Sequence, residues 1–306
     1  INASTYRGIT EKIKKANKAG LYQRVLKDAC NIDVSLVQIG FPFDEVDKTF
    51  FAPVVHLAFF DDACSWKGMS RPFFKPDAVI NTLDDYLWAA EEFIANSKAK
   101  GAVGLKMPVR EMKGEPSRQE ALKAFSMLKD GTVEFLPDLN PLYDYILDYY
   151  ASLAGKYDLV LAVHTGYWED FRRLNPLHII PLVMRHPKTR FDVFHLGYPW
   201  VRVTLMLGKG FPNVWLNLCW THIIAQKFAE DAMSEAVELV PANKILALGA
   251  DYGLPVEKVY GHLIMARENI ARALSPKIDS RQMTFKQVVE LLKKWLRDNP
   301  KDLYRL

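Results

Sequence analysis

Four short apolar runs of the sequence lead into residues that can bind a metal ion or transfer a proton. These residues are Lys106, His164, His195 and Asp251, and the runs are 102–105, 158–163, 190–194 and 244–248. A single histidine at the end of a strand usually serves packing, but here suitable side chains recur at one structural position on four runs. Neutral imidazole nitrogens and carboxylate oxygens are ligands of Zn²⁺ and similar divalent ions. The repetition therefore predicts a metal or catalytic site that these four residues form together.

The elements that carry these residues alternate between apolar runs and helical segments. We expect strands at 33–39, 54–60, 101–107, 158–163, 190–194, 213–218 and 244–248, and helices at 10–29 (with a break at Gly20), 82–99, 117–129, 141–156, 178–185, 200–209, 225–239, 255–274 and 284–297. Nearly continuous apolar strands separated by helices are typical of a parallel sheet that is buried on both faces. A doubly wound sheet and a (βα)8 barrel both have this pattern.

The motifs of the sequence favour the barrel. No Gly-x-Gly-x-x-Gly follows a strand and no P-loop is present, so a nucleotide-binding doubly wound fold loses its main support. The continuity of the pattern predicts one barrel domain over residues 1–306. Because such a barrel has eight strands and seven are visible, we expect the first strand to lie upstream of Ile1. The carboxyl ends of barrel strands meet at one mouth, which would bring the four polar residues into one cleft.

The composition is that of a globular protein with a large core. Of the 306 residues, 49% are hydrophobic and 12% aromatic, which excludes intrinsic disorder. The net charge of +4 comes from charges of both signs that are mixed along the chain, so we expect no nucleic-acid partner. The apolar run 50–60 is shorter than the roughly 20 residues of a membrane-spanning helix, and we expect no membrane association. Three widely spaced cysteines indicate a reducing compartment, and we predict a cytoplasmic protein with a small-molecule substrate and, as an option, a homodimeric assembly.

Five stretches of the second half carry a resemblance to a known family. They are VHTG (163–166), HPKTRFDVFHLG (186–197), FPNVWLNL (211–218), VPANKILALGADYG (240–253) and the tail LRDNPKDLYRL (296–306). In this order they resemble the amidohydrolase superfamily. More narrowly, they resemble the branch of TIM-barrel metal-dependent hydrolases, amidohydrolase family 2, that also contains aromatic-acid decarboxylases. The resemblance covers roughly residues 100–306, and residues 1–99 agree with it only in their pattern of elements.

The resemblance implies a role for each of the four polar residues. His164 corresponds to a metal ligand, and His195 to a ligand of a second metal or to an acid/base beside a single one. Asp251 corresponds to an aspartate that binds metal and takes the proton of the attacking water. Lys106 lies where some members carry a carboxylated lysine between two metals. The implied cofactor is a divalent metal, with zinc first and manganese or iron as alternatives.

The first-strand His-x-His pair of the superfamily is absent from this sequence. The histidines lie at 56, 164, 178, 186, 195, 222 and 262, and no two of them are separated by a single residue. This absence agrees with a first strand that lies upstream of Ile1.

Several residues near the strand ends are candidates for binding a substrate. Arginine side chains bind carboxylates in a forked geometry, and aromatic rings can form a wall beside a site. The candidates are Trp168, Arg172 and Arg173 after His164, Tyr198 after His195, Tyr252 after Asp251, and His222 after the run 213–218. A solvated helix start explains the arginines equally well, and packing explains His222.

Four functions fit these residues. The leading prediction is hydrolysis of an amide, ester or lactone by a metal-activated water, with Asp251 and His195 as catalytic residues. Non-oxidative decarboxylation of an aromatic or unsaturated carboxylic acid uses the same scaffold. Isomerisation of a sugar acid shares the barrel and part of the ligand set. A catalytically inactive binding protein is the fourth option, because the first-strand ligands are missing from the sequence.

Overall fold

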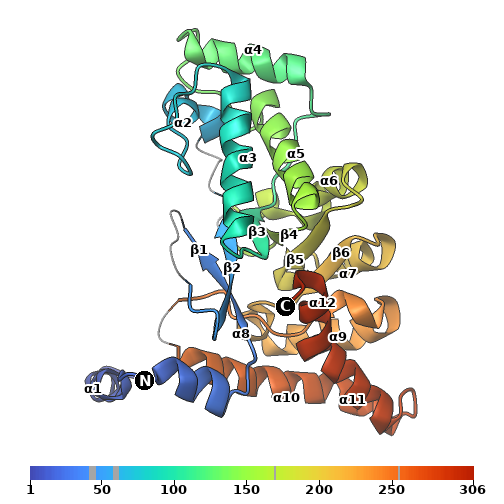
Figure 1. The fold of residues 1–306 in the computed structure, drawn as a ribbon. Coiled ribbons are helices and arrows are strands. Elements are labelled where there is room, and N and C mark those ends of the chain that lie inside the picture. The colour runs from blue at the N-terminus through green and yellow to red at the C-terminus, as the bar shows by residue number, and fades with distance from the viewer. Residues whose placement is uncertain (41–45, 58–61, 169, 254–255) are drawn as a thin grey trace.

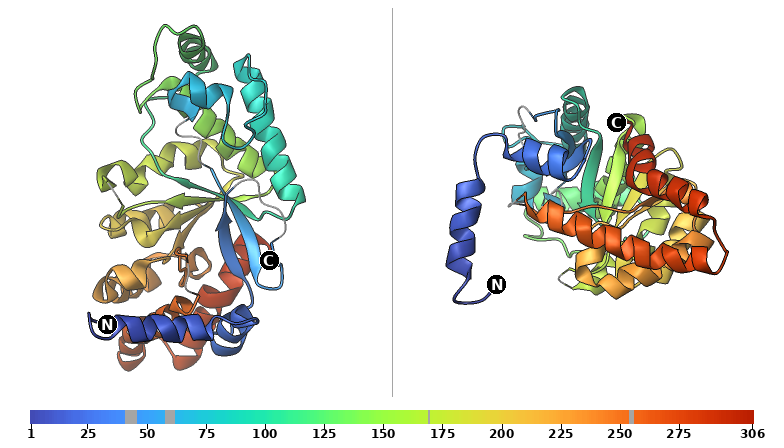
Figure 2. Two further views of the ribbon diagram at one scale, coloured as in Figure 1. Left: turned by 90° about the vertical axis from the view of Figure 1, so that its left-hand side faces the viewer. Right: turned by 90° about the horizontal axis from the view of Figure 1, so that it is seen from below.

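Seven parallel strands form one curled sheet in the computed structural model of the protein. The structure describes residues 1–40, 46–57, 62–168, 170–253 and 256–306. The strands are β1 (Ser35–Ile39), β2 (Phe51–His56), β3 (Gly104–Pro108), β4 (Val160–His164), β5 (Arg190–Phe194), β6 (Val214–Asn217) and β7 (Ile245–Leu246). Each strand pairs with the next one in sequence, and the sheet curls into an incomplete barrel with helices outside it (Figures 1 and 2).

Helices connect the strands and cover the outside of the sheet. The main ones are α3 (Leu83–Ala99), α4 (Arg118–Lys129), α5 (Pro141–Lys156), α6 (Ile180–Arg185), α7 (Val201–Gly210), α9 (Gln226–Leu239) and α10 (Lys258–Asp279). Thr82 and Asp85 form the expected capping box of α3, which supplies partners for the free N–H groups of its first turn. Figure 1 shows α3, α4 and α5 in a helical lobe together with the short α2 (Trp66–Ser70).

Side chains of each strand alternate between the helical layer and the barrel interior, as the pleat of a strand requires. In β5, Phe191 and Val193 belong to the main hydrophobic core with the helices. The next residue, Phe194, packs instead with Ala162 of β4 and with Cys219. The same alternation places Lys106, between the core residues of β3, on the interior side.

The amino-terminal segments differ from the predicted single helix. Residues 10–29 divide into α1 (Tyr6–Ala16) and a π-helical segment, η1 (Gln23–Ala29). The predicted break at Gly20 is present, because this residue adopts a φ of 77° that glycine tolerates best. None of the residues of α1 is buried. The second strand is β2, at Phe51–His56 rather than 54–60, and residues 58–60 lie outside the described part of the chain.

Helices pack against each other across the opening of the sheet between its two edge strands, β7 and β1. Within the described residues, no strand pairing joins β7 to β1. Outside this seam, Val25 and Leu26 of η1 pack in one cluster with Val256 and with Leu263 of α10. The two sides of the seam are therefore held together by their helices.

The carboxy-terminal segment runs back to the barrel interior. It consists of α11 (Phe285–Lys293), the π-helical segment η7 (Lys294–Asp298) and α12 (Asn299–Tyr304). Leu303 and Tyr304 are buried in a cluster with Val54, Val160 and Leu246 from three strands. The end of the chain thus fills part of the space that the strands enclose.

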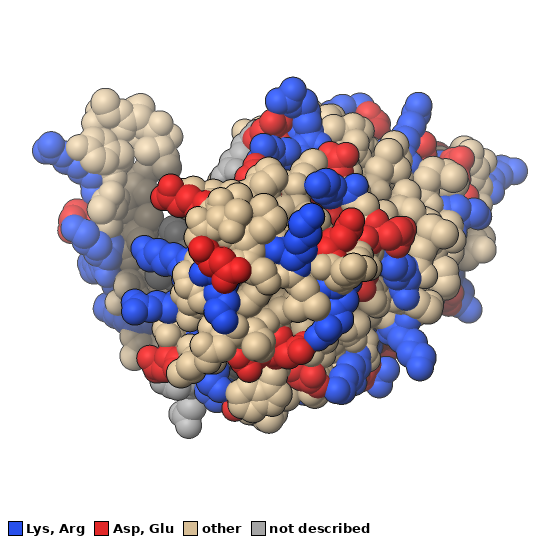
Figure 3. All heavy atoms as spheres, turned by 90° about the horizontal axis from the view of Figure 1, so that it is seen from above, with Lys and Arg blue, Asp and Glu red and all other residues tan. Residues whose placement is uncertain are grey.

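The outer surface carries charges of both signs. Figure 3 shows lysine and arginine side chains interspersed with aspartate and glutamate on the face seen from above. In the part of the chain that the structure describes, every helix is too short or too polar to cross a bilayer.

A buried carboxyl on α5 provides a test of the packing of the helical lobe. Asp144 is 2% exposed, and its Oδ2 accepts hydrogen bonds from the backbone N–H groups of Lys113 and Gly114 at 2.9 and 3.2 Å. Burial outweighs these bonds and raises the pKa of Asp144 from 3.8 to about 6. Between these two pH values the folded protein keeps a proton that the unfolded chain releases, so this carboxyl lowers stability as the pH rises.

We therefore expect Asp144→Asn to raise the free energy of unfolding at pH 7 by about 1–2 kcal/mol. Two pKa units set an upper limit of about 3 kcal/mol, which the weaker hydrogen bonds of an amide reduce. At pH 4 the carboxyl is already protonated in the folded state, and the gain should disappear. Urea unfolding at both pH values measures this, and an equal gain at pH 4 and pH 7 would contradict the packing described.

Candidate metal centre

His164, His195 and Asp251 converge at the carboxyl ends of β4, β5 and β7. One ligand atom from each lies within 4.8 Å of the other two. His195 Nε2 lies 3.0 Å from His164 Nδ1 and 3.3 Å from Asp251 Oδ2. This is the only such group of three or more histidine, cysteine or acidic residues within the described ranges.

Lys106 joins this group from the neighbouring strand β3. Its Nζ lies 3.6 Å from Asp251 Oδ2 and 3.7 Å from the centre of the Phe194 ring. The residue is 3% exposed, and burial lowers the pKa of its ammonium while Asp251 acts in the opposite direction. The four side chains that the sequence singled out therefore lie together.

A sharp backbone turn after β5 presents His195. His195, Leu196 and Gly197 have φ values of 67°, 47° and 59°, an uncommon conformation for residues with side chains. Gly166, after His164, packs against the same turn, and a Cβ there would lie 2.6 Å from backbone atoms of Gly197 and Tyr198. The glycines after the two histidines thus allow the two turns to approach each other.

The hydrogen bonds of His195 determine which of its nitrogens is free. Its Nδ1 lies 2.7 Å from the carbonyl oxygen of Cys219, which can only accept, so Nδ1 carries the proton. Burial lowers the pKa of His195 and keeps the ring neutral. Nε2 then presents a lone pair to the Asp251 carboxylate, and two acceptors at this distance need a cation or a proton between them.

His164 also has a nitrogen that needs a cation or a proton beside it. Its Nε2 is buried and has no hydrogen-bond partner among the described residues. Burial, followed by the neighbouring His195 and Lys106, lowers the pKa of His164 to about 3. A neutral imidazole with a free buried nitrogen, a second neutral imidazole and a carboxylate form a donor set that fits a divalent metal ion.

Asp251 remains ionised in this environment. Burial alone would raise its pKa, but a proton between the carboxylate and the close His195 nitrogen, together with the charge of Lys106, lowers it well below its usual range. The other carboxylate oxygen, Oδ1, accepts a hydrogen bond from Nε2 of Gln38 on β1. Gln38 therefore connects the two sides of the open seam at the site.

Gln38 and Trp220 also lie at the site but were not predicted from the sequence. Gln38 was hidden because it is an ordinary polar residue near the end of an apolar strand. Trp220, just after β6, has a φ of 65°, and its ring centre lies 5.2 Å from that of His195. Its position soon after the end of a strand is the signal that would have identified it, since His195 and His164 also lie at strand ends.

Of the predicted substrate-binding residues, Trp168 lies beside the site. It is 50% exposed, and its ring centre is 5.5 Å from that of Trp220. Arg172 pairs with Asp170 at 2.8 Å and Arg173 with Asp138 at 2.6 Å, all on the surface. These local acidic partners occupy the guanidinium groups that would otherwise be free for a substrate carboxylate.

The remaining three candidates point into protein packing. Tyr198 packs against Phe228 of α9 with ring centres 4.6 Å apart and the ring planes tilted by 54°. The hydroxyl of Tyr252 lies 3.3 Å from Nδ1 of the buried His262. His222 is fully buried; its Nε2 donates to the carbonyl of Ala247, and Asn269 lies beside its Nδ1. His222 therefore does not line the mouth, and its role in the structure is packing.

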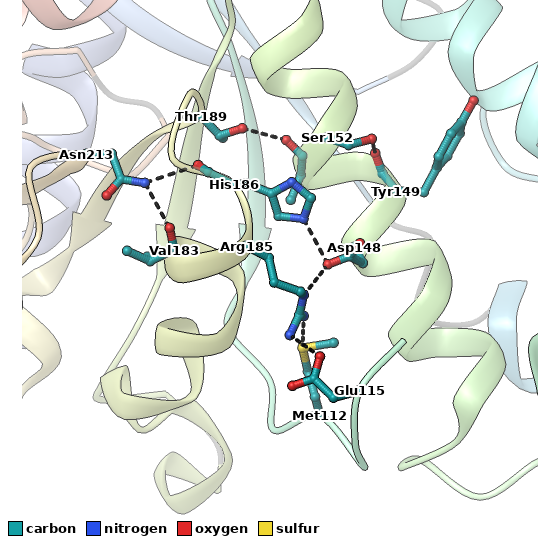
Figure 4. A network of polar contacts seen from close by, with 11 residues as sticks. Met112, Glu115, Asp148, Tyr149, Ser152, Val183, Arg185, His186, Thr189 and Asn213 are labelled. Carbon is teal, nitrogen blue, oxygen red and sulfur yellow. Dashed lines mark hydrogen bonds and ion pairs between the residues drawn. The ribbon is translucent and has the colours of Figure 1, made fainter. Parts of the chain in front are cut away.

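A second histidine–carboxylate pair lies on the outer surface and has a structural role. Figure 4 shows Asp148 of α5 between His186 and Arg185 at the end of α6, with N–O distances of 2.8 and 2.7 Å. Arg185 also pairs with Glu115 at 3.2 Å. Because the arginine neutralises Asp148, this network fastens α6 to α5 and does not provide a second metal site.

The comparison with protein families identifies the class of protein. The family model of the amidohydrolases, Amidohydro_2, matches residues 35–306. The chain belongs to the amidohydrolase family, and the resemblance inferred from the sequence is confirmed. A stretch of 90 residues is also 30% identical to the protein fluG of Emericella nidulans, and this match spans 28% of the present chain and 10% of that protein.

Solved structures confirm the fold. A protein from Lactobacillus casei, provisionally classed as a metal-dependent hydrolase, matches with a TM-score of 0.76 and 20% identity over 99% of this chain and 85% of that one. The uronate isomerase of Thermotoga maritima matches with a TM-score of 0.76 and 16% identity, over 99% and 74% of the two chains. A TIM-barrel protein from Bordetella bronchiseptica matches with a TM-score of 0.51 and 15% identity, over 97% and 89%. The seven parallel strands of the described residues therefore form a TIM-barrel-like fold, which agrees with the predicted (βα)8 barrel that lacks its first strand.

The donor set predicts a measurable loss of metal affinity when one ligand is removed. We expect His164→Asn to weaken Zn²⁺ binding by about 100-fold or more, because the roughly 10–16 kcal/mol of a four-ligand zinc site is shared among its ligands. His178→Asn, which changes a histidine outside the cluster, should leave the affinity unchanged. Calorimetric titration of the metal-free proteins makes the comparison, and equal affinities of the two variants would exclude His164 as a ligand.

Proposed function

We propose that the protein is a metal-dependent hydrolase that cleaves an amide, ester or lactone bond in a small organic molecule. The observation that carries the proposal is the convergence of His164, His195 and Asp251 at the carboxyl ends of the barrel strands, the end at which TIM-barrel enzymes hold their active sites. The amidohydrolase family membership supports it. We propose zinc as the ion, because two imidazoles and a carboxylate are typical zinc ligands.

The chemistry of such a site divides between the ion and the protein. A bound divalent ion lowers the pKa of water toward 7 and polarises the bond to be cleaved. Lys106 and Gln38 orient the carboxylate of Asp251. Because Asp251 is ionised, one of its oxygens can accept a proton from the attacking water. The same oxygen then returns the proton to the leaving group, first as a general base and then as a general acid.

Lys106 and His195 have supporting roles in this proposal. The ammonium of Lys106 is a buried positive charge beside the reacting atoms, where it can stabilise negative charge on the carbonyl oxygen of the substrate. The Cys219 carbonyl holds His195 with its Nε2 toward the centre, so that the ring can serve as a ligand throughout the reaction. This role uses the ammonium form of Lys106 and not the carboxylated form that some members of the family carry at this position.

Trp220 and Trp168 suggest the character of the substrate. Their rings form an apolar surface beside His195, against which a flat or apolar part of a substrate can pack. We expect Trp220→Leu to raise KM about tenfold while kcat changes little, since the indole binds substrate and transition state alike. Trp88→Leu, at an exposed position on α3, serves as the control. A fall in kcat with an unchanged KM would contradict the role proposed for Trp220.

A substrate screen tests the reaction class. The metal-loaded protein should release product from amides, esters or lactones and should leave hydroxybenzoates and uronic acids unchanged. Turnover of hydroxybenzoates with release of CO₂ would favour the decarboxylase, and conversion of uronic acids would favour the isomerase suggested by the uronate isomerase fold. No turnover with any of these compounds, at full metal occupancy, would favour the inactive binding protein.

Two variants separate metal binding from proton transfer. Asp251→Asn keeps one oxygen and the size of the side chain but loses the base, so turnover should fall by about 10²–10⁴-fold, even when excess metal fills the site. His164→Asn should lose activity through loss of metal, and excess metal should partly restore it. Activity measured against metal concentration distinguishes the two. Equal rescue of both variants would show that Asp251 is only a ligand, and His195 would then be the first candidate for the proton carrier.

A further inference from the structure

The tail of the chain reaches the interior strands by polar contacts as well as by packing. Nδ2 of Asn299 donates to the carbonyls of Ala242 and Ile245 at 2.8 and 2.7 Å. The carbonyl of Trp295 accepts a hydrogen bond from the N–H of Ala247 at 3.0 Å. The segment of η7 and α12 therefore lies along β7, the strand that leads to Asp251.

A chain of buried hydrogen bonds continues from Tyr304 to the metal centre. The hydroxyl of Tyr304 and Nδ2 of Asn217 both donate to Oδ2 of Asp192, at 2.7 and 2.9 Å. Oδ1 of Asn217 accepts from the N–H of Cys219 at 2.9 Å. The carbonyl of Cys219 in turn accepts from Nδ1 of His195. All five residues are buried to at least 96%.

The donor and the acceptor of each hydrogen bond in this chain are determined by the groups involved. Burial raises the pKa of the Tyr304 hydroxyl well above its usual value, so it remains a donor. The amide of Asn217 must turn its nitrogen to Asp192 and its oxygen to Cys219, because the opposite orientation would place an acceptor against the carboxylate. Asn217 thereby orients the peptide groups at the end of β6, where Cys219 holds the His195 ring.

Gly104, the first residue of β3, leaves space in the barrel interior for the Tyr304 ring. A Cβ at Gly104 would lie 3.2 Å from the ring of Tyr304 and 2.9 Å from the carbonyl oxygen of Val160. A larger residue at this position would therefore collide with the tyrosine ring and with the backbone of β4. This contact is independent of the hydrogen bonds and holds the ring in place while its hydroxyl bonds Asp192.

We propose that Tyr304 is a positioning residue for the metal centre, acting through Asp192 and Asn217 on the Cys219 carbonyl that orients His195. The inference rests on the proposed metal site but not on the reaction that it catalyses. The proposal gives the tail LRDNPKDLYRL a role in orienting a metal ligand, in addition to filling part of the barrel interior. Protein groups behind metal ligands commonly change metal affinity by 10–100-fold when they are removed.

The first test uses the metal-free, full-length protein and the imidazole resonances of ¹⁵N-labelled histidine. In the wild type, His195 should be the Nδ1–H tautomer, with a proton that exchanges slowly. Tyr304→Phe, which removes only the hydroxyl, should speed this exchange at least tenfold or admit the Nε2–H tautomer. Tyr149→Phe is the matched control, because the Tyr149 hydroxyl also donates to a carboxylate, that of Glu91 at 2.9 Å, on the outside of the barrel.

The second test measures the Co²⁺ affinity of the same proteins and of Asn217→Ala. Tyr304→Phe should weaken binding about tenfold, and the double variant should bind about as weakly as Asn217→Ala alone, since both changes act through one connection. An unchanged His195 signal and Co²⁺ affinity in Tyr304→Phe would overturn the proposal, even if the melting temperature fell. Equal effects of Tyr149→Phe, or multiplicative effects of the two interior changes, would also overturn it. A protein that positions His195 as described but hydrolyses nothing would refute only the proposed function.

Discussion

The parallel register of the strands is the constraint on which the metal centre depends. His164 lies opposite Phe194, Phe194 opposite Asn217, and Asn217 opposite Leu246. His164 is the last residue of β4, His195 directly follows Phe194 and Asp251 lies in the loop after β7, so the three side chains emerge at one rim of the barrel. A shift by one residue in β4 or β5 would move His164 or His195 toward the helical face, because side chains alternate between the two faces of a sheet.

The ligands at the rim of the barrel could be predicted because the ends of the strands can be recognised in the sequence. The apolar runs before His164 and His195 mark their own ends, and these ends need only the parallel topology to converge. Residues on the inner face are harder to recognise. Asn217 and Asp192 lie within strands whose outward-facing partners are apolar, and nothing in their types indicates that one orients the peptide groups that hold a metal ligand.

Loop residues escaped prediction for a different reason. Arg172 and Arg173 were plausible clamps for a carboxylate by type, but the acidic residues that pair with them became visible only in three dimensions. The left-handed conformations of Trp220 and Asp251 depend on tertiary packing, which overrides local preference. The break at Gly20 could be foreseen because glycine is a strong local signal.

The interior of this barrel is unusually polar for a protein core. Lys106, Asp192, His195 and Asn217 are all buried there, and each buried polar group lowers stability unless it is paired. A connected network that runs from the tail to the rim offsets this cost. The same network orients His195 so that its free nitrogen faces Asp251 and His164. A metal centre needs such a group of converging acceptor atoms.

X-ray absorption at the zinc edge of the zinc-loaded protein tests the central claim most directly. The account predicts imidazole scattering from two histidines, with nitrogen and oxygen neighbours at about 2.0–2.2 Å from the ion. It predicts no sulfur neighbour, because Cys219 contributes its carbonyl to His195 and burial raises the pKa of its thiol well above the usual value. A sulfur neighbour at about 2.3 Å, or a shell of oxygen alone without imidazole, would contradict the assignment of His164, His195 and Asp251 as the metal centre.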